Sequence, residues 1–97
     1  MPKGYWIAHG RVDDPQAYEA YRAANAAPLA EFGGRFLVRG GARETVEGEA
    51  KPRSVVIEFP SYEAALACYR SPGYQAALAL RRDISESDLV IAEGWDG

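Results

Sequence analysis

Residues 53–75, RSVVIEFPSYEAALACYRSPGYQ, decide the fold of this chain. The run from Arg53 to Phe59 is rich in β-branched and aromatic side chains and predicts a strand. Pro60-Ser61 then opens a helix, with the serine as its N-cap. Ser71-Pro72-Gly73 interrupts that helix. A second helical segment follows, from Tyr74 to about Arg82, because the serine can cap it and proline is tolerated in a first turn.

The same signals mark the elements on either side of this stretch. Asp14-Pro15 begins a helix that ends at Gly33-Gly34, and Gly40-Gly41 ends a strand. The polar segment 42–53 has room for a short strand around Glu44–Val46, and Ile84–Asp88 is expected to be a connector. The main expected elements are strands at Tyr5–Val12, Arg35–Arg39, Arg53–Phe59 and Leu89–Glu93, and helices at about 15–32 and 61–82.

The order strand, helix, strand, strand, helix, strand predicts one α+β domain over residues 1–97. Two interlocked β-α-β units in this order give the ferredoxin-like fold, β-α-β-β-α-β. It has a four-stranded antiparallel sheet with two helices on one face. A chain of 97 residues fits one such domain.

Composition excludes several classes of function. Hydrophobic residues make up 47% of the chain and charged residues 26%, which is ordinary for a globular protein. The net charge of −3 offers no basic field for nucleic acid, and no apolar run is long enough to span a membrane. A single cysteine, Cys68, excludes an internal disulfide and a cysteine-based zinc cluster. We expect a cytoplasmic protein without metal or cofactor, because signal-peptide and cofactor motifs are missing.

Three expected strands are apolar at successive positions, in Phe36–Val38, Val55–Ile57 and Leu89–Ile91. A strand with one face in water should instead alternate apolar and polar residues. Because the helices cover only one face of the sheet, a second copy packed sheet to sheet would cover the other. We therefore expect a two-fold homodimer. The alternative is that short central strands are simply rich in β-branched residues.

Arg39 and Glu58 are the first candidates for a binding site. Strict alternation along neighbouring strands puts both on the face away from the helices, between the two subunits. A buried charge must be paired. The two residues are then either an anion-binding arginine held by a glutamate in a ligand pocket, or a structural ion pair at the dimer contact.

Four other residues complete the candidate set. His9, the only histidine, could act as a general base near pH 7, although a single histidine on a strand is more often structural. Asn25 lies on the apolar face of the first helix, where it orients a ligand or, in the favoured interpretation, bonds to a carbonyl freed by Pro28. Tyr69 and Tyr74 flank the helix break and either face a pocket or hold the break together.

Four segments resemble the bacterial family called domain of unknown function 1330: YWIAHGRVDDPQAYEAY, GGRFLVRGG, VVIEFPSYEAALACYRSPGYQAALALR and DLVIAEG. The most specific are GGRFLVRGG at 33–41 and EFPSYEAA with YRSPGYQ within 58–75. The resemblance implies the dimeric α/β-barrel version of the ferredoxin-like fold. Relatives of that fold include cofactor-free monooxygenases, muconolactone isomerases, polyketide cyclases and haem-binding enzymes. The family has no established activity, so the resemblance chooses no reaction.

Three functions remain open at this point. The first is a cofactor-independent isomerase, cyclase or monooxygenase acting on a small anionic or aromatic metabolite, in a pocket between the sheet and the dimer partner. His9 would then be the base, Arg39 the anion anchor and Glu58 its partner. The second is a protein that binds a small molecule without reaction. The third is a purely structural homodimer whose barrel is filled with side chains.

Overall fold

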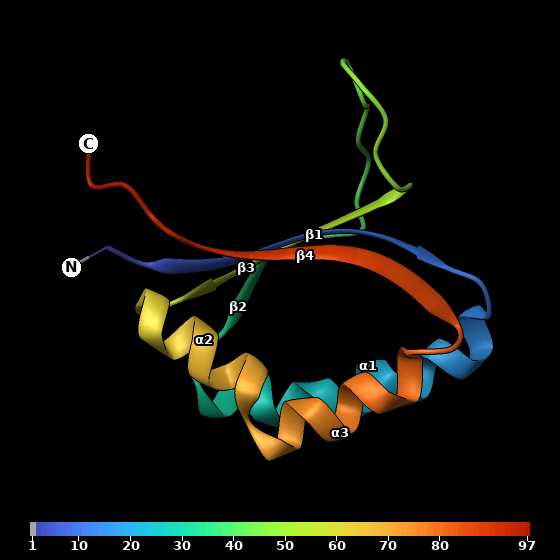
Figure 1. Cartoon of the computed structure of the whole chain (residues 1–97), viewed down its shortest axis with the longest axis horizontal. Helices are drawn as coiled ribbons and strands as arrows, with labels where there is room; N and C mark the ends of the chain where they lie inside the picture. Colours follow the sequence, from blue (N-terminus) through green and yellow to red (C-terminus); the bar gives the residue numbers. More distant parts are fainter. Residues whose placement is uncertain (1) are drawn as a thin grey trace.

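A sheet and a layer of helices make up the computed structural model, which describes residues 2–97 (Figure 1). The four strands are antiparallel in the order β2-β3-β1-β4, and the helices all cover one face. This is the ferredoxin-like arrangement that the order of elements predicts. In chain order the elements are β1 (Gly4–Val12), α1 (Pro15–Glu31), β2 (Arg35–Arg39), β3 (Arg53–Phe59), α2 (Tyr62–Arg70), α3 (Pro72–Arg81) and β4 (Ser85–Glu93).

Side-chain caps fix where each helix begins. The Asp14 carboxylate accepts a hydrogen bond from the Ala17 amide at 3.1 Å, and Pro15 takes the first position of α1. Ser61 and Ser71 cap α2 and α3 through their hydroxyls. Each cap satisfies an amide that the first turn leaves without a partner. The predicted break at Ser71 is confirmed, and it divides the second helical region into two helices.

The core lies between the sheet and the helices and is built around Trp6. Its indole nitrogen donates a hydrogen bond to the Ala65 carbonyl at 2.9 Å, which joins β1 to α2. Its ring lies 5.2 Å from the centre of Phe59 and 4.8 Å from that of Tyr74. Such tilted and edge-on aromatic pairs stabilise a core beyond the area they bury. No helix of residues 2–97 has the length and apolar character needed to cross a membrane.

Two predictions about the chain between the main elements are wrong. β4 begins at Ser85, so Ile84–Asp88 is mostly strand, because the second half of β1 pairs with Ser85 to Asp88 and satisfies their backbone groups. Glu44–Val46 forms no strand. The segment 40–52 instead projects from the sheet as a long loop on the side away from the helices (Figure 1).

A β-bulge interrupts the pairing of β2 with β3. Phe36 pairs with Ile57, but Val38 pairs with Val56 and Arg39 with Val55, so Leu37 is an extra residue. An extra residue shifts the side-chain alternation of everything that follows it in the strand. Arg39 therefore faces the helices.

Candidate functional site

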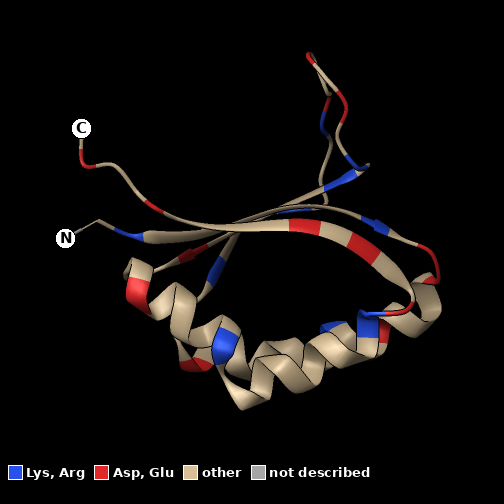
Figure 2. Ribbon diagram, viewed as in Figure 1, with Lys and Arg blue, Asp and Glu red and all other residues tan. Residues whose placement is uncertain are grey.

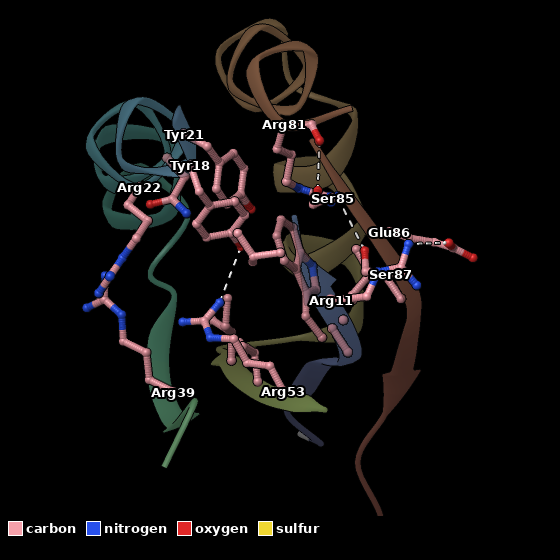
Figure 3. Close-up of a pocket in the computed structure, with 18 of the residues that line it drawn as sticks. Arg11, Tyr18, Tyr21, Arg22, Arg39, Arg53, Arg81, Ser85, Glu86 and Ser87 are labelled. Carbon is pink, nitrogen blue, oxygen red and sulfur yellow. Dashed lines mark hydrogen bonds and ion pairs between the residues drawn. The ribbon is translucent and has the colours of Figure 1, made fainter. Parts of the chain in front are cut away.

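A cavity lies between the helix-facing side of the sheet and helices α1 and α3 (Figure 3). Its volume is about 70 Å³ for the centres of water-sized molecules. One water needs roughly 10–15 Å³ by that measure, so the space can hold a small organic molecule. The lining combines aromatic, small and arginine side chains: Trp6, Ala8, Gly10, Arg11, Val12, Tyr18, Tyr21, Arg22, Asn25, Phe36, Arg39, Arg53, Val55, Ile57, Tyr74, Arg81, Ser85, Glu86, Ser87 and Leu89.

The predicted pairing of Arg39 with Glu58 is wrong. The bulge in β2 turns Arg39 into the cavity, whereas Glu58 stays on the opposite face of the sheet. There the Glu58 carboxylate pairs with Arg35 at 3.2 Å and with Lys3 at 3.6 Å. The prediction assumed an unbroken strand, and a single extra residue separates the two side chains.

Three arginines of the cavity wall lie against aromatic rings. The guanidinium carbon of Arg39 is 4.2 Å from the centre of the Phe36 ring, and that of Arg81 is 5.1 Å from Tyr21. The corresponding distance from Arg53 to Tyr18 is 5.7 Å, and Arg53 also donates a hydrogen bond to the Tyr18 hydroxyl at 3.3 Å. Figure 3 shows Arg53 and Arg81 on either side of the tyrosines of α1, whereas Arg39 lies beside Arg22 at the edge of the cavity.

None of the ion pairs formed within residues 2–97 involves Arg39, Arg53 or Arg81. The one carboxylate of the lining, Glu86, is paired with Arg11 at 3.0 Å. Stacked guanidinium groups without carboxylate partners keep their donors available for an anion. The cavity is therefore a locally positive site in a chain whose net charge is −3.

Tyrosine hydroxyls form a hydrogen-bonded chain beside these arginines. The hydroxyls of Tyr21 and Tyr74 lie 2.7 Å apart, and Arg81 donates to the Tyr74 hydroxyl at 3.4 Å. Burial raises the pKa of Tyr74, and burial also raises the pKa of Tyr18. Both hydroxyls are thus protonated at neutral pH, where they can donate hydrogen bonds but cannot act as bases.

Asn25 and Tyr74 both line the cavity, whereas Tyr69 does not. Asn25 is 5% exposed, and its side-chain amide makes no hydrogen bond to any residue of the described chain. The favoured bond from Asn25 to a carbonyl freed by Pro28 is therefore absent from residues 2–97. Tyr69 packs its ring edge-on against Trp6, and its carbonyl accepts a hydrogen bond from the Gln75 side chain at 2.6 Å.

His9 lies outside the cavity, because it occupies the face of β1 that points away from the helices. Its Nδ1 is 2.9 Å from the Ser54 hydroxyl of β3. It borders a second, more open cavity together with the loop residues 49–52 and Asp88. Within residues 2–97, no three His, Cys, Asp or Glu side chains gather as a metal site would require.

Sequence reasoning missed Tyr18, Tyr21, Arg53 and Arg81 as cavity residues. One signal was present, because alternation places Arg53 on the face of its strand opposite to Glu58, which was expected to face away from the helices. Tyr18 and Tyr21 lie on the same helix face as Asn25, which was expected to be apolar. Nothing in the sequence indicates that Arg81, near the end of α3, folds back over Tyr21.

Three solved structures share this fold. A protein of unknown function from Rhodopseudomonas palustris is 19% identical and has a TM-score of 0.76, with 99% of this chain and 85% of that chain covered. SnoaB, a cofactor-independent oxygenase from Streptomyces nogalater, is 19% identical with a TM-score of 0.67, covering 100% and 97%. A dimeric ferredoxin-like protein of unknown function from Thermobifida fusca is 20% identical with a TM-score of 0.63, covering 95% and 91%.

These identities are low enough that the three likenesses concern the fold alone. No curated protein matches the sequence. The model of the family described as domain of unknown function 1330 matches residues 3–95, which is nearly the whole chain. The chain belongs to this family, DUF1330.

Proposed function

We propose that this protein binds a small, planar organic anion in the cavity between its sheet and its helices, and acts on it as an enzyme. The observation that carries the proposal is the set of Arg39, Arg53 and Arg81, which line one cavity without carboxylate partners in residues 2–97. Arginine binds carboxylates through two parallel hydrogen bonds, so a carboxylate is the favoured anion.

The walls favour a flat, conjugated ligand. Trp6, Tyr18, Tyr21 and Phe36 all line the cavity, and three of these rings already support a guanidinium group. An aromatic or conjugated ligand can stack on the same surfaces. The cavity volume of about 70 Å³ for water centres suits a molecule with a single ring.

The reaction class we propose is isomerase, cyclase or monooxygenase chemistry on an acidic substrate. Fixed positive groups that face a forming enolate or phenolate would stabilise the transition state. Electrostatic stabilisation of this kind is usually the largest single contribution to catalysis. SnoaB, a cofactor-independent oxygenase, shares the fold and makes such chemistry a reasonable proposal by analogy. His9, Glu58 and Tyr69 have no part in this proposal. Arg39 and Asn25 keep their place as candidate ligand-binding residues, and Tyr74 is part of the cavity wall.

A non-catalytic binding protein is the second candidate. The described lining contains no histidine or cysteine, and Glu86 is held by Arg11. A site without a free base near neutral pH is poorly equipped for proton transfer from a weakly acidic substrate. Such a protein would return its ligand unchanged.

Calorimetry with benzoate and the neutral benzyl alcohol tests the binding site. Benzoate should bind at least about tenfold more tightly, because charge-assisted hydrogen bonds contribute about 1.5–3 kcal/mol. Equal affinity, or no binding of either, would contradict the proposal. Phenylpyruvate, an anion with an enolisable ketone, tests catalysis through the absorbance of its enol. Binding without faster keto–enol exchange would favour the non-catalytic candidate.

We also propose that the protein is a homodimer joined through the face of the sheet that points away from the helices. Ile7 and Val90 are paired neighbours on this face and are 39% and 59% exposed. The loop 40–52 carries charges of both signs and projects on the same side (Figure 2). The Thermobifida fusca protein of the same fold is dimeric, which supports a second copy as the partner.

A further inference from the structure

Helix α1 presents four polar side chains to the cavity, and two of them, Tyr21 and Asn25, are buried. These two are four residues apart and so lie one above the other on one face of the helix. Both are buried, with 8% and 5% of their surface exposed, and both line the cavity. Burying polar groups in a largely aromatic wall is unfavourable unless they form hydrogen bonds, so a ligand with a polar group opposite these two side chains would be favoured.

The Asn25 amide has hydrogen-bonding capacity that the described chain does not use. It carries two donors and an acceptor, and none of them bonds to another of residues 2–97. No fully enclosed side-chain nitrogen or oxygen in those residues lacks a partner, so the Asn25 amide must reach the open space of the cavity. A molecule inside the cavity can therefore accept its hydrogen bonds.

The Tyr21 hydroxyl is oriented by its neighbours. Arg81 donates to the Tyr74 oxygen, and Tyr74 and Tyr21 share one hydrogen bond. If Tyr21 donated to Tyr74, the Tyr74 proton would have no acceptor among the described residues, although that side chain is almost completely enclosed. Tyr74 is therefore the donor, and the Tyr21 proton is free to point into the cavity.

We propose that Tyr21 and Asn25 together donate hydrogen bonds to a carbonyl or enol oxygen of the ligand. This inference rests on the proposed function, and it narrows the ligand to a conjugated acid that carries a second oxygen apart from its anionic group. The arginines bind the anionic end, and the two α1 side chains bind the oxygen. In a reaction through an enolate, this pair would stabilise the charge on that oxygen.

Calorimetry with benzoate, 3-formylbenzoate and 4-formylbenzoate tests the inference. The aldehyde supplies a carbonyl acceptor at two positions, and benzoate lacks it. Wild type should bind one formyl isomer about tenfold more tightly than benzoate, since two neutral hydrogen bonds contribute roughly 0.5–1.5 kcal/mol each. Asn25→Leu and Tyr21→Phe should each lose most of that preference, which is the ratio of the formylbenzoate and benzoate affinities measured in the same variant.

Tyr62→Phe is the matched control, because Tyr62 begins α2 and does not line the cavity. It should keep the wild-type preference, and thermal unfolding checks that all variants are folded. Benzoate binding with no preference for either isomer, or a preference that survives both cavity variants, overturns the inference and leaves the proposed function standing. Absence of binding by all three carboxylates overturns both.

Discussion

The guanidinium carbon of Arg39 lies 4.2 Å from the centre of the Phe36 ring. Two residues three positions apart in a regular strand point to opposite faces of the sheet. Here the β-bulge between Phe36 and Val38 inserts one residue and brings both side chains to the helix-facing side. Bulges often lie next to functional sites because they redirect a side chain.

Arg39 and Arg35 belong to the same strand but lie on opposite faces of the sheet, so their contributions to benzoate binding can be measured separately. Arg39→Ala should weaken benzoate binding by about ten- to a hundredfold, the range given by charge-assisted hydrogen bonds of roughly 1.5–3 kcal/mol. Arg35→Ala should leave the affinity unchanged, because Arg35 pairs with Glu58 on the other face. Calorimetry measures the benzoate affinity of both variants. Equal losses of affinity in the two would mean that Arg39 acts only through the overall charge of the protein.

Local signals were sufficient to predict most of the fold. Arg35–Arg39 and Arg53–Phe59 have the expected bounds, since glycine or proline borders each of them. The caps at Asp14, Ser61 and Ser71 also follow from residue type. The start of β4 was missed, because polar residues at 85–88 form a strand only through pairing with β1, which is a long-range effect.

The site was harder to predict than the fold, because its prediction assumed that side chains alternate between the two faces along the whole of β2. The sequence of β2 contains no glycine that would indicate a bulge, so Arg39 was assigned to the wrong face. Asn25 was correctly identified as buried, but its missing partner is visible only in three dimensions. The roles of Arg53 and Arg81 depend on contacts with Tyr18 and Tyr21, which lie far away in the sequence.

Filling the cavity should abolish binding without unfolding the protein. Ala8 lies in the middle of β1, between Val55 and Leu89, and faces the cavity. Ala8→Leu should remove measurable benzoate binding. It should change the free energy of unfolding by less than the roughly 1–3 kcal/mol that overpacking a filled core costs. Ala42→Leu, in the exposed loop, is the control for calorimetry and urea unfolding. Retained binding in Ala8→Leu would place the ligand elsewhere.

Stability should fall in alkaline solution because of Cys68. The thiol is completely enclosed, and burial raises its pKa from 9.0 to about 11. Between these values the unfolded chain has lost the proton that the folded chain keeps, so the free energy of unfolding decreases as pH rises. Urea unfolding at pH 8, 9 and 10 measures this slope. Cys68→Ala should be less stable overall but show a flatter slope, and parallel curves would exclude Cys68 as the cause.

A charge placed on the open face of the sheet should separate the proposed dimer. Val90 is 59% exposed in a single subunit and pairs with Ile7, so Val90→Lys is compatible with the folded monomer. In a sheet-to-sheet contact the same lysine would be buried without a partner, which is strongly unfavourable. Sedimentation should find a dimer for wild type and a folded monomer for Val90→Lys. Leu80→Lys, at an exposed position of α3, should remain a dimer. A monomeric wild type, or equal behaviour of both variants, would exclude this interface.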